Sequence, residues 1–128
     1  MLAKKAKYVY GIEVVKEAII NARQNAKKNN IENAEFKVAK VEDVINDYIK
    51  KDVNTIVVDP PRKGLDQNVV KALLASNIKR IVYVSCNPTS FARDLNLLKE
   101  KFDLKKISVV DMFCQTTGAE CVSLLELQ

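Results

Sequence analysis

The chain has 128 residues, a formal net charge of +5 from 21 basic and 16 acidic side chains, and no histidine. This length suits one domain with a hydrophobic core, and the longest apolar runs have only strand length, which argues against a membrane span. Three cysteines without a CxxC spacing argue against a disulfide framework and against a zinc site, so no metal is expected. The first residues lack the long apolar core of a signal peptide, which predicts a cytoplasmic protein. The positive charge fits a polyanionic partner and fits an ordinary lysine-rich surface equally well.

Strand-like and helix-like patterns alternate along most of the chain. In order, the sequence predicts a strand over 6–12, a helix over 14–28, a strand over 34–38, a helix over 41–50, a strand over 55–59, a helix over 67–75, a strand over 81–85, a helix over 89–101, and strands over 105–112 and 121–127. Alternating strands and helices form parallel βαβ units, and the last two strands have no helix between them. We therefore expect an α/β fold with a Rossmann-like sheet that ends in an antiparallel β-hairpin.

Several predicted strands end at acidic or thiol side chains, and open α/β sheets bind ligands at such strand ends. Glu13 follows the first strand, where an acidic residue accepts hydrogen bonds from the ribose of a nucleotide cofactor. The alternative interpretation is an ordinary solvated carboxylate at a helix start, which the helix dipole favours. The Gly-rich turn that precedes such a residue in nucleotide-binding domains does not precede Glu13 here.

Asp59 and Cys86 end the two strands in the middle of the chain and predict the rim of an active site. Two prolines stiffen the chain after Asp59, which aims its carboxylate either at a base or at a capping position. Cys86 is either a small buried hydrophobe or a nucleophile, and a helix that begins near Pro88 places partial positive charge near its sulfur, which favours the thiolate. Cys114 and Cys121 lack that setting and are interpreted as structural.

Four stretches together resemble the RNA uracil-5-methyltransferase family, whose members use S-adenosylmethionine. They are VYGIE at 9–13, VVDPPRKG at 57–64, IVYVSCNPTSFARDL at 81–95 and VVDMFCQTTGAECVSLLEL at 109–127. The resemblance implies that 1–128 is part of a catalytic methyltransferase domain with a Rossmann-like sheet, without its first strand and Gly-rich loop. It also implies methyl transfer from S-adenosylmethionine to C5 of a uridine in tRNA or rRNA.

This reaction needs a nucleophile and a base. C5 of uracil attacks a sulfonium methyl group only after a thiolate has added at C6, and a base must then remove the C5 proton so that the thiol can leave. The resemblance implies that Cys86 is the nucleophile and Glu120 is the base. Asp59 would contact both the uracil and the cofactor.

The resemblance also implies binding roles for five further residues. Glu13 would hold the cofactor ribose, and Lys40 would lie near the adenine in a segment that departs from the family's GKAE-like loop at Ala39 and Val41. The residues implied for RNA contact are Arg62, Lys63 and Asn87. Arg62 and Lys63 are equally explained as a solvated loop, and the target base must be flipped out of any stack.

The chain also departs from the family. Cys114 stands where proline is common, and the small Gly118-Ala119 pair predicts a looser loop before the base. The absent first strand lies in mid-sheet in this fold, which leaves two unpaired edges that we expect to close on each other or to form a homodimer.

The alternative function is a truncated, inactive remnant that at most binds RNA or oligomerises. Two other reactions fit less well. Methylation of an adenine amino group uses an aromatic residue at the position of Arg62, and cytosine-5 methylation shares only the thiol.

Overall fold

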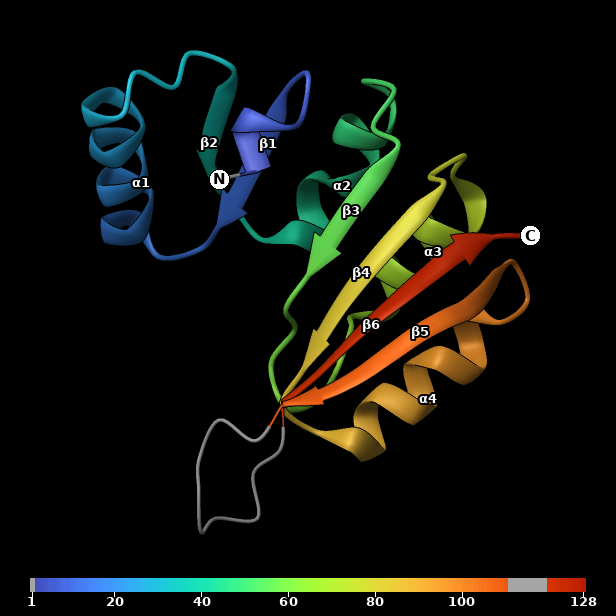
Figure 1. Cartoon of the computed structure of the whole chain (residues 1–128). Helices are drawn as coiled ribbons and strands as arrows, with labels where there is room; N and C mark the ends of the chain where they lie inside the picture. Colours follow the sequence, from blue (N-terminus) through green and yellow to red (C-terminus); the bar gives the residue numbers. More distant parts are fainter. Residues whose placement is uncertain (1, 111–119) are drawn as a thin grey trace, which may run out of the picture. The chain divides into compact units, whose positions relative to one another are not determined.

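The computed structural model describes residues 2–110 and 120–128, and the chain divides into two compact units, Met1–Tyr48 and Ile49–Gln128 (Figure 1). The elements in chain order are η1 (Leu2–Lys4), β1 (Val9–Glu13), α1 (Lys16–Lys28), β2 (Ala34–Val38), α2 (Val41–Ile49), β3 (Thr55–Val58), α3 (Gln67–Ala75), β4 (Arg80–Ser85), α4 (Pro88–Leu98), β5 (Phe102–Val110) and β6 (Glu120–Leu127). The predicted order of strands and helices is confirmed. Over the two described ranges, no helix has both the length and the apolar content to cross a membrane.

Three expectations lie outside the described residues. They concern the end of a strand at 111–112, the structural role of Cys114, and the loose Gly118-Ala119 pair. Inside the described residues, the largest boundary differences are three residues, at the start of β1, which begins at Val9 rather than at residue 6, and at α4 and β5. The helix ends at Leu98 and the strand already begins at Phe102, three residues earlier than predicted in each case. Phe102 is only 1% exposed, so it belongs to the core at the start of β5 and the chain must leave the helix before it.

In the first unit, α1 connects two parallel strands. β1 pairs with β2 in a register that places Gly11 opposite Phe36. A Cβ atom on Gly11 would lie 2.7 Å from Cδ1 of Phe36, so the glycine lets the Phe36 ring lie against the strand. Ile19 is the buried side chain of α1, while most of that helix is exposed.

The second unit is built on a four-stranded sheet in the order β3-β4-β6-β5. β3 and β4 are parallel, and β6 runs antiparallel to both β4 and β5, which confirms the terminal hairpin. Figure 1 shows α3 and α4 on the same side of this sheet. The side chains that fill the layer between helices and sheet are apolar and at most 6% exposed: Leu73, Ile81, Tyr83, Phe91, Leu98, Phe102 and Leu125.

The opposite face of this sheet also carries apolar side chains. Val57 is opposite Val82 and Val82 is opposite Leu124, so these residues form one row across three strands. Val57 is 49% exposed, and Val122 on the same face is 37% exposed. The alternation of β4 and β6 therefore separates a helix-covered face from a more open apolar face.

The described strands form two separate sheets rather than one. β1 pairs only with β2, and β3 pairs only with β4, so each has one edge without a strand partner in this part of the chain. The expectation that these two edges close directly on each other stays a prediction. The homodimer that was the other expectation stays a prediction.

Candidate active site

The predicted catalytic residues meet at one end of the four-stranded sheet. Ser85 is opposite Cys121 in the ladder between β4 and β6. Cys86 follows Ser85, and Glu120 precedes Cys121 as the first residue of β6, so Cys86 and Glu120 occupy neighbouring positions where β4 ends and β6 begins. Figure 1 shows these two element ends side by side. Asp59 directly follows β3, which runs parallel to β4 and ends at the same side of the sheet. We call Asp59, Cys86 and Glu120 the strand-end rim.

The three rim residues are reachable from solvent to different extents. Asp59 is exposed, whereas Cys86 and Glu120 are half-buried. Cys121, the other described cysteine, is 6% exposed, and its sulfur lies 3.6 Å from Oγ of Ser123 inside the helix-covered face. The structure therefore distinguishes a half-buried thiol at the sheet end from a buried thiol in the core.

A tight turn fixes the backbone around Cys86. The Ser85 hydroxyl donates to the carbonyl of Asn87 at 2.9 Å and accepts from the Asn87 N–H at 3.1 Å, so these two bonds bracket the cysteine. Asn87 is the N-cap of α4, and its Oδ1 accepts from the N–H of Thr89 at 3.0 Å. Pro88 occupies the first turn of the helix, where its missing N–H and fixed φ are favourable.

Asn87 also connects the helix to the loop that follows Asp59. Its Nδ2 donates to the carbonyl of Arg62 at 3.0 Å. Both ends of the Asn87 amide therefore make hydrogen bonds within the protein, which gives this predicted substrate-binding residue a structural task as well. The side chains of Arg62 and Lys63 are exposed.

Sequence reasoning missed the residue that organises this region, which is Asp94. The carboxylate of Asp94 is 0% exposed and accepts from the hydroxyl of Tyr83 at 2.6 Å and from the N–H of Leu65 at 2.7 Å. It also accepts from Nη2 and Nε of Arg93, at 2.6 and 3.0 Å. Arg93 Nη2 donates in addition to the carbonyl of Lys63 at 2.7 Å.

A signal for Asp94 does exist in the sequence. Phe91, Asp94 and Leu98 follow each other at helical spacing, so an acidic residue stands in the apolar stripe of a predicted helix. A carboxylate on a buried face needs several donors, because burying an unpaired charge is very unfavourable. Burial, and next its hydrogen bond to Asp94, raises the pKa of Tyr83 well above the ordinary tyrosine value.

Gly64 allows the loop to approach this carboxylate. Its φ is +85°, a conformation that side chains rarely adopt, and its N–H donates to the carbonyl of Pro61 at 2.8 Å. A Cβ atom at this position would lie 2.5 Å from Oδ2 of Asp94 and would also overlap Nη2 of Arg93. The glycine of DPPRKG is thus explained by close packing against α4.

The predicted cofactor residues Glu13 and Lys40 lie in the first unit, at the carboxyl ends of its two paired strands. Glu13 is exposed at the end of β1, and its Oε1 accepts from the N–H of Val15 at 3.0 Å, where α1 begins. The N–H of Ala39 donates to the Glu13 carbonyl at 3.1 Å, which brings the segment before α2 to this strand end. Lys40 follows and is exposed.

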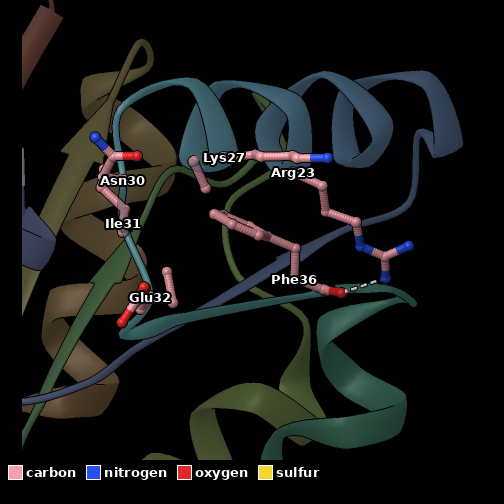
Figure 2. A pocket seen from close by; sticks show the side chains of 8 residues that line it. Arg23, Lys27, Asn30, Ile31, Glu32 and Phe36 are labelled. Atoms are coloured by element: carbon pink, nitrogen blue, oxygen red, sulfur yellow. Dashed lines mark hydrogen bonds between the residues drawn. The ribbon is translucent and has the colours of Figure 1, made fainter.

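A surface cavity of about 380 Å³ lies elsewhere in the first unit, beside α1 and β2 (Figure 2). Its lining residues are Arg23, Ala26, Lys27, Asn30, Ile31, Glu32, Ala34 and Phe36. Arg23 Nη2 donates to the carbonyl of Phe36 at 2.6 Å across its wall (Figure 2). None of the predicted site residues lines this cavity, so it is distinct from the predicted site. Within 2–110 and 120–128, no three acidic or cysteine side chains cluster as metal ligands would.

Comparison with known proteins connects these features to a family. The family model described as tRNA (Uracil-5-)-methyltransferase matches residues 1–128. An uncharacterized RNA methyltransferase of Listeria innocua is 48% identical over 130 residues, which cover 99% of this chain and 29% of that protein. A second one, from Oceanobacillus iheyensis, is 50% identical over 130 residues, which cover 99% and 28%. The chain thus spans less than a third of the length of these relatives.

Solved structures agree with this assignment. The tRNA (uracil-54, C5)-methyltransferase of Pyrococcus abyssi, in complex with S-adenosyl-L-homocysteine, matches with a TM-score of 0.83 and 39% identity, covering 97% of this chain and 30% of that chain. An rRNA methylase of Streptococcus thermophilus matches with a TM-score of 0.73 and 16% identity, covering 98% and 76%, which shows the fold alone.

The comparisons confirm the expected Rossmann-like methyltransferase fold. S-adenosylhomocysteine is what remains of S-adenosylmethionine after its methyl group has left, so the expected methyl donor of the family is confirmed as well. The match of the family model covers all four motifs from which the resemblance was drawn. The chain belongs to the tRNA (uracil-5-)-methyltransferase family.

Proposed function

We propose that this chain carries the chemical groups for methyl transfer from S-adenosylmethionine to C5 of a uridine in tRNA or rRNA. The observation that carries the proposal is the register of β4 and β6, which brings Cys86 and Glu120 to neighbouring positions at one sheet end. A nucleophile that adds to C6 and a base that removes a proton from C5 must both reach the same uracil ring, so they must lie on neighbouring parts of the protein. Family membership supports the same reaction.

In the proposed mechanism, the Cys86 thiolate adds to C6 of the uracil. A sulfur–carbon bond forms, and the electrons of the C5–C6 double bond move toward the O4 carbonyl as an enolate. S-adenosylmethionine, when bound, would supply an electrophilic methyl group to C5: the new carbon–carbon bond forms as the methyl–sulfur bond breaks, and S-adenosylhomocysteine leaves. Glu120 then accepts the proton from C5, the double bond is restored, and the thiolate leaves C6.

The neighbouring residues supply binding. Asp59 is exposed on the same rim and accepts hydrogen bonds from the ring N–H of uracil in this proposal. Arg62, Lys63 and Asn87 follow along the loop and helix start and contact the RNA, where the two exposed cations favour phosphates. Glu13 and Lys40 contribute to cofactor binding from the strand ends of the first unit, Glu13 through the ribose and Lys40 near the adenine.

Trapping of the covalent adduct tests the proposal. An RNA that contains 5-fluorouridine has no C5 proton to lose after methyl transfer, so elimination of the thiol is blocked and protein stays bonded to RNA in denaturing gels. We expect this complex with the unmodified chain in the presence of S-adenosylmethionine, and none with Cys86→Ser. Cys121→Ser is the matched control, because it alters a buried cysteine on the helix-covered face. An equal yield from Cys86→Ser would overturn the nucleophile assignment.

Glu120→Gln tests the base with ordinary uridine. The glutamine cannot accept the C5 proton, so the methylated adduct should accumulate and turnover should fall by about 100-fold or more. A variant that loses turnover without accumulating adduct would contradict the role of base and would place the loss before proton removal.

A second candidate function rests on coverage and on the two open sheet edges. The chain corresponds to 28–30% of its relatives, and β1 and β3 each pair on one side only in the described residues. By this alternative, the chain is a truncated remnant without turnover that binds RNA or forms a homodimer through these edges. Calorimetric titration with S-adenosylmethionine separates the two, since measurable binding supports the enzyme and its absence supports the remnant. The molar mass in solution tests the homodimer.

A further inference from the structure

We propose that Asp94 and Arg93 are positioning residues that hold the 59–65 loop against α4 and thereby set Asp59 relative to Cys86. The inference rests on the proposed function, because it assigns Asp59 to the uracil. It concerns two residues on α4 that belong to neither the catalytic pair nor the expected binding residues.

Three hydrogen bonds between the loop and α4 with its cap fasten the loop at residues 62, 63 and 65. Asn87 Nδ2 donates to the carbonyl of Arg62 at 3.0 Å, and Arg93 Nη2 donates to the carbonyl of Lys63 at 2.7 Å. The third bond runs the other way, from the N–H of Leu65 to Asp94 at 2.7 Å. All three engage loop backbone, so they fix the path of the chain and leave the side chains of Arg62 and Lys63 exposed.

The Asp94 carboxylate, to which the loop is bonded, is held in place by further contacts. Asp94 is 0% exposed and is also bonded to the hydroxyl of Tyr83 at 2.6 Å, so it joins the loop to β4 as well as to α4. Tyr83 lies on the strand that leads to Cys86, and its ring contacts Phe91 of α4 with ring centres 5.0 Å apart. One carboxylate therefore connects the loop after Asp59 with both elements that flank Cys86.

The position of Asp59 depends on this connection. Asp59 is exposed and stands at the start of the loop, directly after the last ladder position of β3. A misplacement of about 1 Å is enough to slow a positioned reaction by about 100-fold. Fastening of the loop at 62, 63 and 65 restricts the path of the chain after Asp59 and so keeps its carboxylate on the strand-end rim.

Arg93→Ala tests the fastening: the Arg93 side chain is 55% exposed, so its removal leaves no cavity in the core, but it also takes the ion-pair partner from the buried Asp94 carboxylate. Loss of its bond to the Lys63 carbonyl should raise hydrogen exchange of the Gly64 and Leu65 amides about tenfold, with β4 and β6 unchanged. Lys105→Ala is the matched control, since it removes another exposed cation from an ion pair, with Asp103 at 3.0 Å. Equal exchange in the loop of both variants would overturn the proposal.

A double-mutant cycle separates positioning from general stability. In the presence of Asp59, Arg93→Ala should slow methyl transfer about tenfold, whereas in an Asp59→Asn background it should slow it less than twofold. A tenfold loss in both backgrounds would show that Arg93 does not act through Asp59 and would overturn the positioning role. Hydrogen exchange can be measured without turnover. If the unmodified chain shows no methyl transfer but Arg93→Ala still raises exchange in the loop, the proposed function is refuted while the fastening of the loop by Arg93 is supported.

Discussion

Gly64→Ala is the most direct test of the packing between the 59–65 loop and α4. Alanine at this position must adopt a φ of +85°, and its Cβ would lie 2.5 Å from Oδ2 of Asp94. The carboxylate cannot move aside easily, because it is fully buried and accepts hydrogen bonds from Tyr83, Leu65 and Arg93. The loop must therefore lift away from the helix.

The expected cost follows from these two effects. A non-glycine residue in the left-handed region costs about 1–2 kcal/mol. Loss or stretching of a hydrogen bond to the buried charge, here the bond from the N–H of Leu65, costs about 1.5–3 kcal/mol more. The free energy of unfolding should therefore fall by about 2.5–5 kcal/mol, which corresponds to a drop in Tm of roughly 10–20 °C for a chain of this size.

Urea and thermal unfolding, followed by circular dichroism, measure this change. Lys63→Ala is the matched control, since its side chain is exposed and only its backbone carbonyl contacts Arg93. The control should lose less than about 0.5 kcal/mol. A loss below about 1 kcal/mol for Gly64→Ala would refute the close packing of the loop on Asp94.

Three further predictions concern the same unit. Tyr83→Phe removes a hydrogen bond to Asp94 and should lower the free energy of unfolding. Because the pKa of Tyr83 is raised in the folded state, the loss relative to the unmodified chain should be full at pH 7–9 and shrink as pH rises above about 10. Urea titrations measure the loss, and a larger loss at pH 11 than at pH 8 would contradict this reasoning. Asn87→Ala removes the N-cap of α4 and should cost about 1–2 kcal/mol in urea unfolding, where a neutral result would contradict the capping role. Leu125→Ala in the core should cost about 2–5 kcal/mol, against less than about 1 kcal/mol for the 41%-exposed Leu97→Ala, and equal costs would contradict the assigned core.

Much of the fold was predictable because it is encoded locally. The predicted bounds of α3 match the structure, since Asp66 caps the helix by accepting from the N–H of Asn68 at 2.8 Å and the apolar spacing then runs to Ala75. The start of α4 was predictable for the same reason, from Asn87 and Pro88. Boundaries were less certain where a distant contact decided them, as at Phe102, whose burial begins β5 early.

The candidate site was predictable in its residue types but only partly in its connections. Strand ends and motif resemblance selected Asp59 and Cys86, and the resemblance alone selected Glu120. The ladder between β4 and β6 then brought Glu120 beside Cys86, a juxtaposition that depends on register between segments far apart in the chain. The role of Asn87 at the substrate stays a prediction, and only the structure showed that its amide also caps α4 and bonds to the 59–65 loop.

The sequence by itself determined where strands and helices form, which of them end in reactive groups, and the family to which the chain belongs. Hydrophobic periodicity, capping residues and prolines act over a few residues, so they can be read along the chain. Only the tertiary structure decided that Asp94 joins loop, helix and strand, that Gly64 must lack a side chain, and that β4 pairs with β6 in the register that brings Glu120 beside Cys86. These outcomes depend on contacts between residues that are far apart in the sequence. The hydrogen-bond partners of a buried carboxylate or of a strand edge are set by the packing of distant segments and not by neighbouring residues in the chain.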